Sequence, residues 1–218
     1  VSSPQQKEAR EVLEKRAREV GAPLEFISEP WTGSSISLPG KHQQWNAALA
    51  AGAIKAAGFH IPQNVIIQGL GNAVWRARFE RIKEPGKTEI VVDGAHNADS
   101  AEALLQTWRE VFKDAEPVII CAMAANKDSD TIINLLSEIA DNFIFPSIQT
   151  LRKTACPKDL TRLVPAQIPS QVTNTLEKAL EKARLQDKPI LVAGSLLLAG
   201  EMLALLDKNS DEYEPSEQ

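Results

Sequence analysis

Residues 89–206 alternate short apolar runs with amphipathic segments, and this alternation limits the possible folds more than any other feature of the chain. The apolar runs, which we predict to be strands, cover 89–93, 118–123, 143–145 and 190–193. The segments with helical spacing cover 98–112, 129–140, 175–185 and 196–206. Strands that alternate with helices predict an α/β fold, in which a mostly parallel sheet carries helices on both faces.

Residues 1–77 have a different pattern, with few predicted strands. We predict a helix over 4–20 that ends at Gly21, an alanine-rich helix over 42–57 that approaches a neighbouring element closely, and a helix over 62–70. A short strand is expected at 24–27, and the Gly-, Ser- and Pro-rich stretch 30–40 is expected to be a loop with at most one short strand. These elements make a poor core for a segment of this length.

The domain organisation follows from these two patterns. We expect residues 1–77 to belong to an incomplete domain and residues 78–206 to form a complete one. The acidic tail, 207–218, is expected to be disordered. The chain lacks an initiator Met, which either processing or a cut from a longer chain would explain.

Charge and composition exclude several classes of protein. The formal net charge is −5 and no basic face is apparent, which argues against nucleic-acid binding. No apolar run is long enough for a membrane span, and the opening Val1–Pro4 does not begin a signal peptide. Cys121 lies in an apolar run and is predicted to be buried, and with Cys156 as its only companion a reduced cytosolic chain is expected.

The histidines and cysteines do not provide a recognisable metal site. His42, His60 and His96 are isolated from one another in the sequence. No paired-cysteine or His-x-x-x-His pattern occurs, so no metal is expected to bind through such a motif in this chain.

The sequence Asp-Gly-Ala-His-Asn at 93–97 lies between a predicted strand and the helix after it. In doubly wound sheets, ligands bind at the carboxyl ends of strands, and helix amino termini favour anions. Asp93 would then hold a ribose hydroxyl, and His96 would face a substrate carboxylate. In the alternative interpretation Asn97 caps the helix, Gly94 forms a turn and His96 is solvated. The spacing alone is compatible with both.

Three further segments each have a functional and a purely structural interpretation when read alone. At 38–48 the amide of Asn46 is placed to meet a purine edge, but when the segment is read alone a glycine turn before a polar helix is the favoured interpretation. At 75–80 an arginine would reach a nucleotide phosphate, but when the segment is read alone an exposed linker is favoured. At 193–196, Ser195 either belongs to an anion cradle or caps the following helix.

Two segments imitate phosphate-binding motifs and are rejected. Residues 85–88 end like a phosphate-binding loop, but Arg81 occupies the position that requires a glycine, and a predicted strand follows. Residues 69–71 begin like a dinucleotide fingerprint, but Val74 stands where the third glycine is needed. The chain therefore contains no recognisable phosphate-binding loop.

Taken in order, these segments closely resemble the second half of folylpolyglutamate and dihydrofolate synthases, which are members of the Mur ligase superfamily. The segments are Gly40–Gln43, Asn46–Ala48, Trp75, Arg78–Glu80, Asp93–Asn97, Asn126–Asp128, Gly194–Leu196 and Gly200–Glu201. The opening, with Ser3–Gln5 and Glu8–Ala9, resembles the central domain of that family. The resemblance extends to about residue 206, and Asp-Gly-Ala-His-Asn is its most specific piece.

The resemblance implies an α/β fold with a Rossmann-like carboxy-terminal domain, 78–206, which binds glutamate. Residues 1–77 would be the last part of the Mur-ligase central domain, which binds ATP. The implied reaction uses ATP to phosphorylate a folate or dihydropteroate carboxylate, and the amine of L-glutamate then attacks the acyl phosphate. The resemblance also implies a cytoplasmic, monomeric enzyme of folate biosynthesis and one-carbon metabolism. The phosphate-binding loop and the Mg²⁺ ligands are expected upstream, so we expect no ligase activity from this chain alone.

The resemblance also assigns roles to individual residues. The positions expected to contact ATP are Asn46, Arg78 and Asp93. Those expected to help hold glutamate are His96 and Ser195. Those expected to support the site are His42, Gln43, Asn97 and Lys127. Many relatives have Pro-Gly before the arginine, whereas Arg76-Ala77 stand here. This difference leaves open which of Arg76 and Arg78 meets phosphate, and Arg78 is preferred.

Two other functions remain compatible with the sequence. One is a non-catalytic nucleotide-binding or regulatory module derived from a Mur-type ligase, which a start codon directly before Val1 would favour. The other is a Mur-type ligase that acts on a cell-wall precursor, against which the Asp-Gly-Ala-His-Asn signature argues. The choice between dihydrofolate synthase, folylpolyglutamate synthase and a bifunctional enzyme depends on pterin contacts outside these residues.

Overall fold

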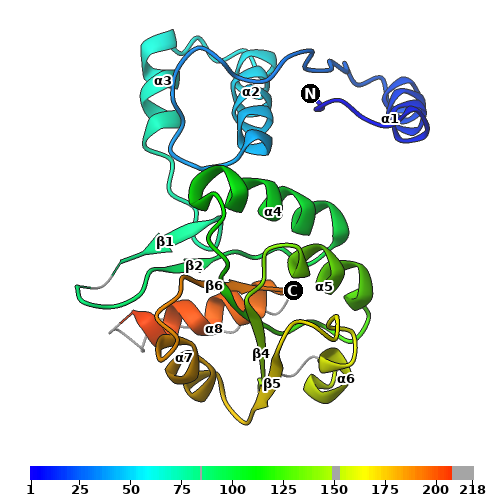
Figure 1. Ribbon diagram of the computed structural model, residues 1–218. Helices are drawn as coiled ribbons and strands as arrows, with labels where there is room; N and C mark the ends of the chain where they lie inside the picture. The colour runs from blue at the N-terminus through cyan, green and yellow to red at the C-terminus, as the bar shows by residue number, and fades with distance from the viewer. Residues whose placement is uncertain (84, 149–152, 208–218) are drawn as a thin grey trace. The chain divides into compact units, whose positions relative to one another are not determined.

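The computed structural model describes residues 1–83, 85–148 and 153–207. The chain divides into two compact units, Val1–Val74 and Trp75–Gln218 (Figure 1). Of the expected disordered tail, only Asp207 is among the described residues; 208–218 lie outside them. No helix in the described ranges is long and apolar enough to cross a membrane.

The first unit contains the three predicted helices. They are α1 (Lys7–Val20), α2 (Lys41–Ala56) and α3 (Gln63–Gly71). Gly21 ends α1 with a φ of 65°, as predicted, and its N–H faces the last carbonyls of the helix. Close packing of α2 is also confirmed, because a Cβ atom added at Gly52 would lie 2.6 Å from Cδ1 of Ile27.

The strand predicted at 24–27 does not form. Phe26 makes a single parallel bridge with Ser2, through hydrogen bonds from Ser2 N–H to Glu25 O and from Ile27 N–H to Ser2 O. A strand needs a neighbour along its length, and within the described residues this segment has one for a single position only. Residues 30–40 form no strand either, so this stretch is a loop throughout.

The second unit is a six-stranded sheet with helices on both faces, which confirms the predicted fold class (Figure 1). The strand order is β1-β2-β6-β3-β4-β5, and every neighbouring pair is parallel except β1 with β2. The strands are β1 (Glu80–Ile82), β2 (Ile90–Val92), β3 (Val118–Cys121), β4 (Asn142–Pro146), β5 (Ser170–Thr173) and β6 (Ile190–Ala193). The helices are α4 (Ala98–Phe112), α5 (Ser129–Ser137), α6 (Pro157–Thr161), α7 (Leu176–Arg184) and α8 (Leu196–Leu206).

The sheet separates two apolar cores. Helices α4, α5 and α6 pack on one face, where Trp108 of α4 is fully buried. Helices α7 and α8 pack on the other face, where Met202 of α8 is fully buried. Alternate residues of each central strand enter opposite cores; in β2, Val91 enters the first core while Ile90 and Val92 enter the second. The predicted burial of Cys121, in β3, is confirmed.

Three elements were not predicted from the sequence: β1, β5 and α6. Both strands lie at an edge of the sheet, and their sequences, Glu-Arg-Ile and Ser-Gln-Val-Thr, carry no apolar run. An edge strand is often short and polar, because one side of it meets solvent instead of another strand. Helix α6 has only five residues, which is too short for a helical period to be recognised.

Candidate functional site

The two most specific motifs follow adjacent parallel strands. Residues 93–97 follow β2, and residues 194–195 follow β6, which pairs with β2. The two turns are tied by hydrogen bonds from Asp93 N–H to Val192 O, 2.9 Å, and from Gly194 N–H to Ala95 O, 2.9 Å. The structure therefore brings Asp93, His96 and Ser195 to one region at the carboxyl edge of the sheet.

This region is a topological switch point. Helix α4, which follows β2, packs on one face of the sheet, whereas α8, which follows β6, packs on the other. The chain thus leaves two adjacent strands in opposite directions, and in open α/β sheets such a divergence is where ligands bind. Both helices also begin here, and their free N–H groups favour a carboxylate or a phosphate.

Gly194 allows the turn that follows β6 to pack closely against the residues at the end of β3. It is buried and has a φ of 117°, a region that residues with a Cβ atom rarely adopt. An added Cβ atom would lie 2.9 Å from the carbonyl oxygen of Ala122 and 2.8 Å from Sγ of Cys121. The turn that carries Ser195 therefore requires glycine for both backbone and steric reasons.

The carboxylate of Asp93 accepts two backbone hydrogen bonds. Oδ2 accepts the N–H of Phe79, and Oδ1 accepts the N–H of Ala95, each at 2.8 Å. Burial raises the pKa of Asp93, although these two N–H groups and the nearby charge of Arg78 oppose the shift. Both oxygens are thus engaged by the protein itself, each with one further acceptor position.

Arg78 lies in a strained loop next to this carboxylate. Ala77 and Phe79, on either side of it, have φ values of 57° and 48°. The side chain of Phe79 is buried and packs against Trp108, with ring centroids 6.2 Å apart. The guanidinium of Arg78 lies near Gly94, where an added Cβ atom would be 3.0 Å from its Nη1.

The two candidate arginines have different partners. Nε of Arg76 lies 2.7 Å from Oε1 of Glu80, and its Nη1 lies 2.9 Å from Oδ2 of Asp207. The hydrogen bond to Asp207 is the main cause that raises the pKa of Arg76. Arg78 makes no ion pair within 4 Å among the residues that the structure describes. Arg78 is therefore the better placed of the two to meet an external anion.

His96 is half-buried and is oriented by its own turn. Its Nδ1 lies 3.0 Å from the carbonyl oxygen of Gly94. Because a carbonyl oxygen only accepts, Nδ1 carries the hydrogen, which leaves Nε2 of the neutral ring as an acceptor. The backbone N–H of His96 donates to Oγ of Ser100, 3.0 Å.

Asn97 and Ser195 cap the two helices that begin at this edge. The Asn97 side chain accepts the N–H of Ser100, 2.8 Å, while Oγ of Ser100 accepts the N–H of Asn97, 3.0 Å, so α4 begins with a reciprocal capping box. Oγ of Ser195 accepts the N–H of Leu198, 3.1 Å. The capping interpretation of both residues is confirmed, and contacts of either with a ligand stay a prediction.

Lys127 lies in the loop that follows β3, at the same edge of the sheet. Its N–H donates to Ala124 O, 3.2 Å, and Asp128 next to it caps α5 by accepting the N–H of Thr131, 3.2 Å. The loop is also bridged to the chain near Thr154 through Ala124. Lys127 thus follows the carboxyl end of a third strand, the end of the sheet at which ligands bind in open α/β folds.

The remaining predicted residues lie on α2, in the first unit. Nδ2 of Asn46 donates to Oε1 of Gln43, 2.9 Å, and Nε2 of Gln43 lies 3.0 Å from Nε2 of His42. Gln43 is buried, whereas Asn46 is exposed. The three side chains form one hydrogen-bonded row, in which Gln43 orients the amide of Asn46.

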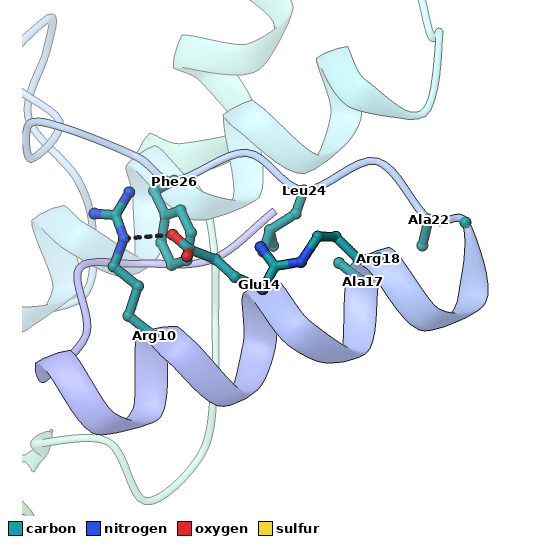
Figure 2. Close-up of a pocket in the computed structure, with 8 residues that line it drawn as sticks. Arg10, Glu14, Ala17, Arg18, Ala22, Leu24 and Phe26 are labelled. Atoms are coloured by element: carbon teal, nitrogen blue, oxygen red, sulfur yellow. Dashed lines mark hydrogen bonds and ion pairs between the residues drawn. The ribbon is translucent and has the colours of Figure 1, made fainter.

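A cavity of about 380 Å³ in the first unit is lined by none of the predicted residues (Figure 2). It lies between α1 and the segment that follows it, and the residues around it are Arg10, Glu14, Ala17, Arg18, Gly21, Ala22, Leu24 and Phe26. The guanidinium of Arg10 covers the ring of Phe26, 4.3 Å from its centroid, and pairs with Glu14, 2.8 Å. The Arg10 charge is thus already matched, and we do not place the candidate site here.

Sequence reasoning missed the backbone groups that shape the site. The residue types at 77 and 79 do not signal the positive φ of Ala77 and Phe79, since alanine and phenylalanine normally adopt negative φ. The support that Glu80 gives to this loop, by accepting the N–H of Ala77 at 2.9 Å, was not predicted either. Within the described ranges, no group of three or more His, Cys, Asp or Glu side chains is placed to hold a metal ion.

Solved structures share the fold of this chain. A folylpolyglutamate synthase from Mycobacterium tuberculosis, complexed with ADP and AMPPCP, matches with a TM-score of 0.83 and 20% identity, over 98% of this chain and 55% of that chain. Escherichia coli FolC, in complex with DHPP and ADP, matches with a TM-score of 0.76 and 21% identity, over 92% of this chain and 51% of that chain.

Sequence relatives extend the comparison. A dihydrofolate synthase/folylpolyglutamate synthase from Bacillus subtilis is 27% identical over 196 residues, which are 85% of this chain and 44% of that protein. The Escherichia coli protein of the same description is 24% identical over 164 residues, 75% of this chain and 38% of that protein. This chain thus spans less than half the length of both relatives. Residues 77–196, more than half of the chain, match the family described as Mur ligase, glutamate ligase domain, and the chain belongs to this family.

Proposed function

We propose that this chain is the glutamate-binding portion of an ATP-dependent ligase that joins L-glutamate to a folate or dihydropteroate carboxylate. The observation that carries the proposal is the meeting of the 93–97 turn, Arg78 and Ser195 at the switch point of the sheet. The curated relatives named above are dihydrofolate and folylpolyglutamate synthases, which supports the choice of substrates. In this proposal residues 1–77 end a central ATP-binding domain, and residues 78–206 form the glutamate-ligase domain.

The proposed reaction has two steps. ATP transfers its γ-phosphoryl group to the substrate carboxylate, which gives an acyl phosphate and ADP. The amine of glutamate then attacks the acyl carbon; the new C–N bond forms, the C–O bond to phosphate breaks, and phosphate leaves. This chemistry depends on positioning and charge neutralisation more than on covalent participation of protein groups. Arg78, which has no ion-pair partner within the described chain, is placed to neutralise phosphate.

Glutamate brings carboxylates and an amine, and the switch point offers a complementary group for each. The amino termini of α4 and α8 favour the carboxylates. In the neutral ring of His96, Nε2 is an acceptor, which suits an amine N–H. We propose that His96 and Ser195 contact glutamate and that Lys127 and Asn97 support them.

The row on α2 suits the base of a nucleotide. Because Nδ2 of Asn46 donates to Gln43, its Oδ1 is left to accept from an exocyclic amine of adenine. We propose that His42 and Gln43 keep the amide in this orientation. In the second unit, taken by itself, we propose that Asp93 and Arg78 contact the nucleotide.

Mg²⁺, if bound, would neutralise phosphate oxygens during phosphoryl transfer. The described residues contain no cluster of carboxylate or imidazole ligands that fits the ion. We therefore propose that its ligands and the phosphate-binding loop are supplied by sequence outside this chain. A cytoplasmic location and a monomeric state stay predictions.

A ligand titration tests the glutamate site directly. L-Glutamate is added to the isotope-labelled 218-residue chain, and amide and imidazole signals are followed by NMR, with D-glutamate as the control. We expect L-glutamate to shift the signals of His96 and the first turns of α4 and α8 more than D-glutamate does. Equal responses, or none, would refute a stereospecific glutamate site in this chain.

A turnover assay tests the reaction. The chain is incubated with ATP, Mg²⁺, labelled L-glutamate and either dihydropteroate or tetrahydrofolate, alone and after extension by upstream sequence with a phosphate-binding loop. We expect product only from the extended protein, and the preferred acceptor identifies the activity. Steady product from the chain alone would contradict the proposal that the phosphate-binding loop and the Mg²⁺ ligands lie outside this chain. An extended protein that binds nucleotide without turnover would favour the non-catalytic module.

A further inference from the structure

Arg78 is held in a loop that is strained on both sides. Its neighbours Ala77 and Phe79 both occupy the left-handed backbone region, with φ values of 57° and 48°. Residues other than glycine adopt this region infrequently, and a bulky aromatic residue does so only where its surroundings hold it. The conformation that presents Arg78 therefore needs identifiable restraints.

The restraints come mainly from the turn that follows β2. Phe79 N–H donates to Oδ2 of Asp93 at 2.8 Å, and the carbonyl oxygen of Ala77 accepts the N–H of Gly94 at 2.9 Å. The Asp93 carboxylate is itself fixed, because its Oδ1 accepts the N–H of Ala95 at 2.8 Å. The residues on either side of Arg78 are thus hydrogen-bonded to the segment 93–95.

The same segment limits where the guanidinium lies. Nη1 of Arg78 would be 3.0 Å from a Cβ atom at Gly94, so the absent side chain leaves space for it. Arg78 is half-buried, and the charge of the Asp93 carboxylate is close enough to influence it without a direct ion pair within 4 Å. The backbone restraint, and not a salt bridge, sets its position.

We propose that Asp93 is a positioning residue for Arg78: its carboxylate holds the strained 77–79 loop and so fixes the guanidinium over Gly94. The role in phosphate binding rests on the proposed function, whereas the restraint of the loop rests on the hydrogen bonds alone. The proposal differs from a purely ribose-binding role for Asp93, because both of its oxygens already accept backbone N–H groups.

Hydrogen exchange on the intact 218-residue chain tests the restraint. In Asp93→Asn one of the two oxygens becomes an NH₂ donor, so Phe79 or Ala95 loses its acceptor. We expect exchange of that amide to become about tenfold faster. Asp114→Asn, at an exposed carboxylate in the loop after α4, is the matched control and should leave both amides unchanged. Unchanged protection of both amides in Asp93→Asn would overturn the proposal.

A pH titration of the unmodified chain keeps the proposal testable where the variant does not fold. The amide signals of Phe79 and Ala95 and the Nε–H signal of Arg78 should move with one common midpoint, because one carboxylate influences all three. Three unrelated midpoints, or no transition at the two amides, would overturn the proposal.

A double-mutant cycle separates positioning from direct contact, with ADP affinity as the readout. Arg78→Gln and Asp93→Asn should each weaken ADP binding by about tenfold, and the double variant should be no weaker than Arg78→Gln alone. Additive losses would mean that Asp93 contacts the nucleotide independently, which overturns the positioning role. Absence of ADP binding in the unmodified chain would count against the proposed function, and the exchange and titration results then decide the restraint.

Discussion

Replacing Gly194 with alanine tests how tightly the turn that follows β6 packs against the residues at the end of β3. The φ of 117° at this position is unfavourable for any residue with a Cβ atom. The added Cβ atom would also lie 2.9 Å from the carbonyl oxygen of Ala122 and 2.8 Å from Sγ of Cys121. The contact with Ala122 involves backbone, which cannot rotate away as the end of a flexible side chain does.

The two effects of Gly194→Ala have separate magnitudes. The strained backbone costs on the order of 1–3 kcal/mol, and overpacking costs about 1–3 kcal/mol more. The sum, about 2–6 kcal/mol, is a large share of the roughly 5–15 kcal/mol that stabilises a native protein. With about 2–4 °C lost per kcal/mol in a chain of this size, Tm should fall by roughly 4–24 °C.

Urea denaturation followed by far-UV circular dichroism measures this loss. Gly86→Ala is the matched control, because Gly86 has a φ of 69° but no atom within 4 Å of an added Cβ atom. The control therefore carries the backbone penalty without the contact. We expect the free energy of unfolding to fall by at least about 1 kcal/mol more in Gly194→Ala than in Gly86→Ala. Equal decreases in the two variants would mean that the residues at the end of β3 move aside without cost, and would refute the packing argument.

Three other predictions use the same neighbourhood. Gly94→Ala should change the free energy of unfolding by less than about 1 kcal/mol, because the closest contact is the mobile end of an exposed leucine, yet it should weaken ADP binding by displacing Arg78; thermal melts and an ADP titration check this. Burial raises the pKa of Asp93 above its ordinary 3.8, so the free energy of unfolding relative to Asp93→Asn should be highest below 3.8 and should decrease as pH rises through the folded-state pKa; paired urea titrations across pH would show the opposite slope if this is wrong. Burial raises the pKa of the Cys121 thiol to about 12, so a thiol reagent at mildly alkaline pH should label exposed Cys156 alone until denaturant is added, and labelling of both in the native chain would contradict this.

The central strands were predictable because they are buried on both faces. The three residues of β2, Ile90–Val92, are fully apolar and alternate between two cores, which leaves a continuous apolar run in the sequence. The edge strands β1 and β5 left no such run, since solvent replaces a neighbour on one side. Helix α4 was predicted at its observed bounds, because its apolar face and its Asn97 cap both mark the sequence.

The candidate site was predictable only in part, for a similar reason. The positions of Asp93 and Ser195 at strand ends follow from the local pattern, but the pairing of β2 with β6 joins residues far apart in the chain. That pairing creates the switch point, and no local pattern encodes it. The strain at Ala77 and Phe79 is set by long-range hydrogen bonds, so propensity alone predicts the wrong backbone region there.

The ion pair between Arg76 and Asp207 joins the beginning of the second unit to the end of its last described helix. Residues 76 and 207, at the two ends of the described part of this unit, therefore lie side by side, and a short peptide is enough to connect them. The two ends of the glutamate-ligase unit can thus be spliced by a short peptide and new ends opened in a surface turn. A circularly permuted protein of this kind should keep the strand order of the sheet, so that the unit can be inserted into another protein without loss of its fold.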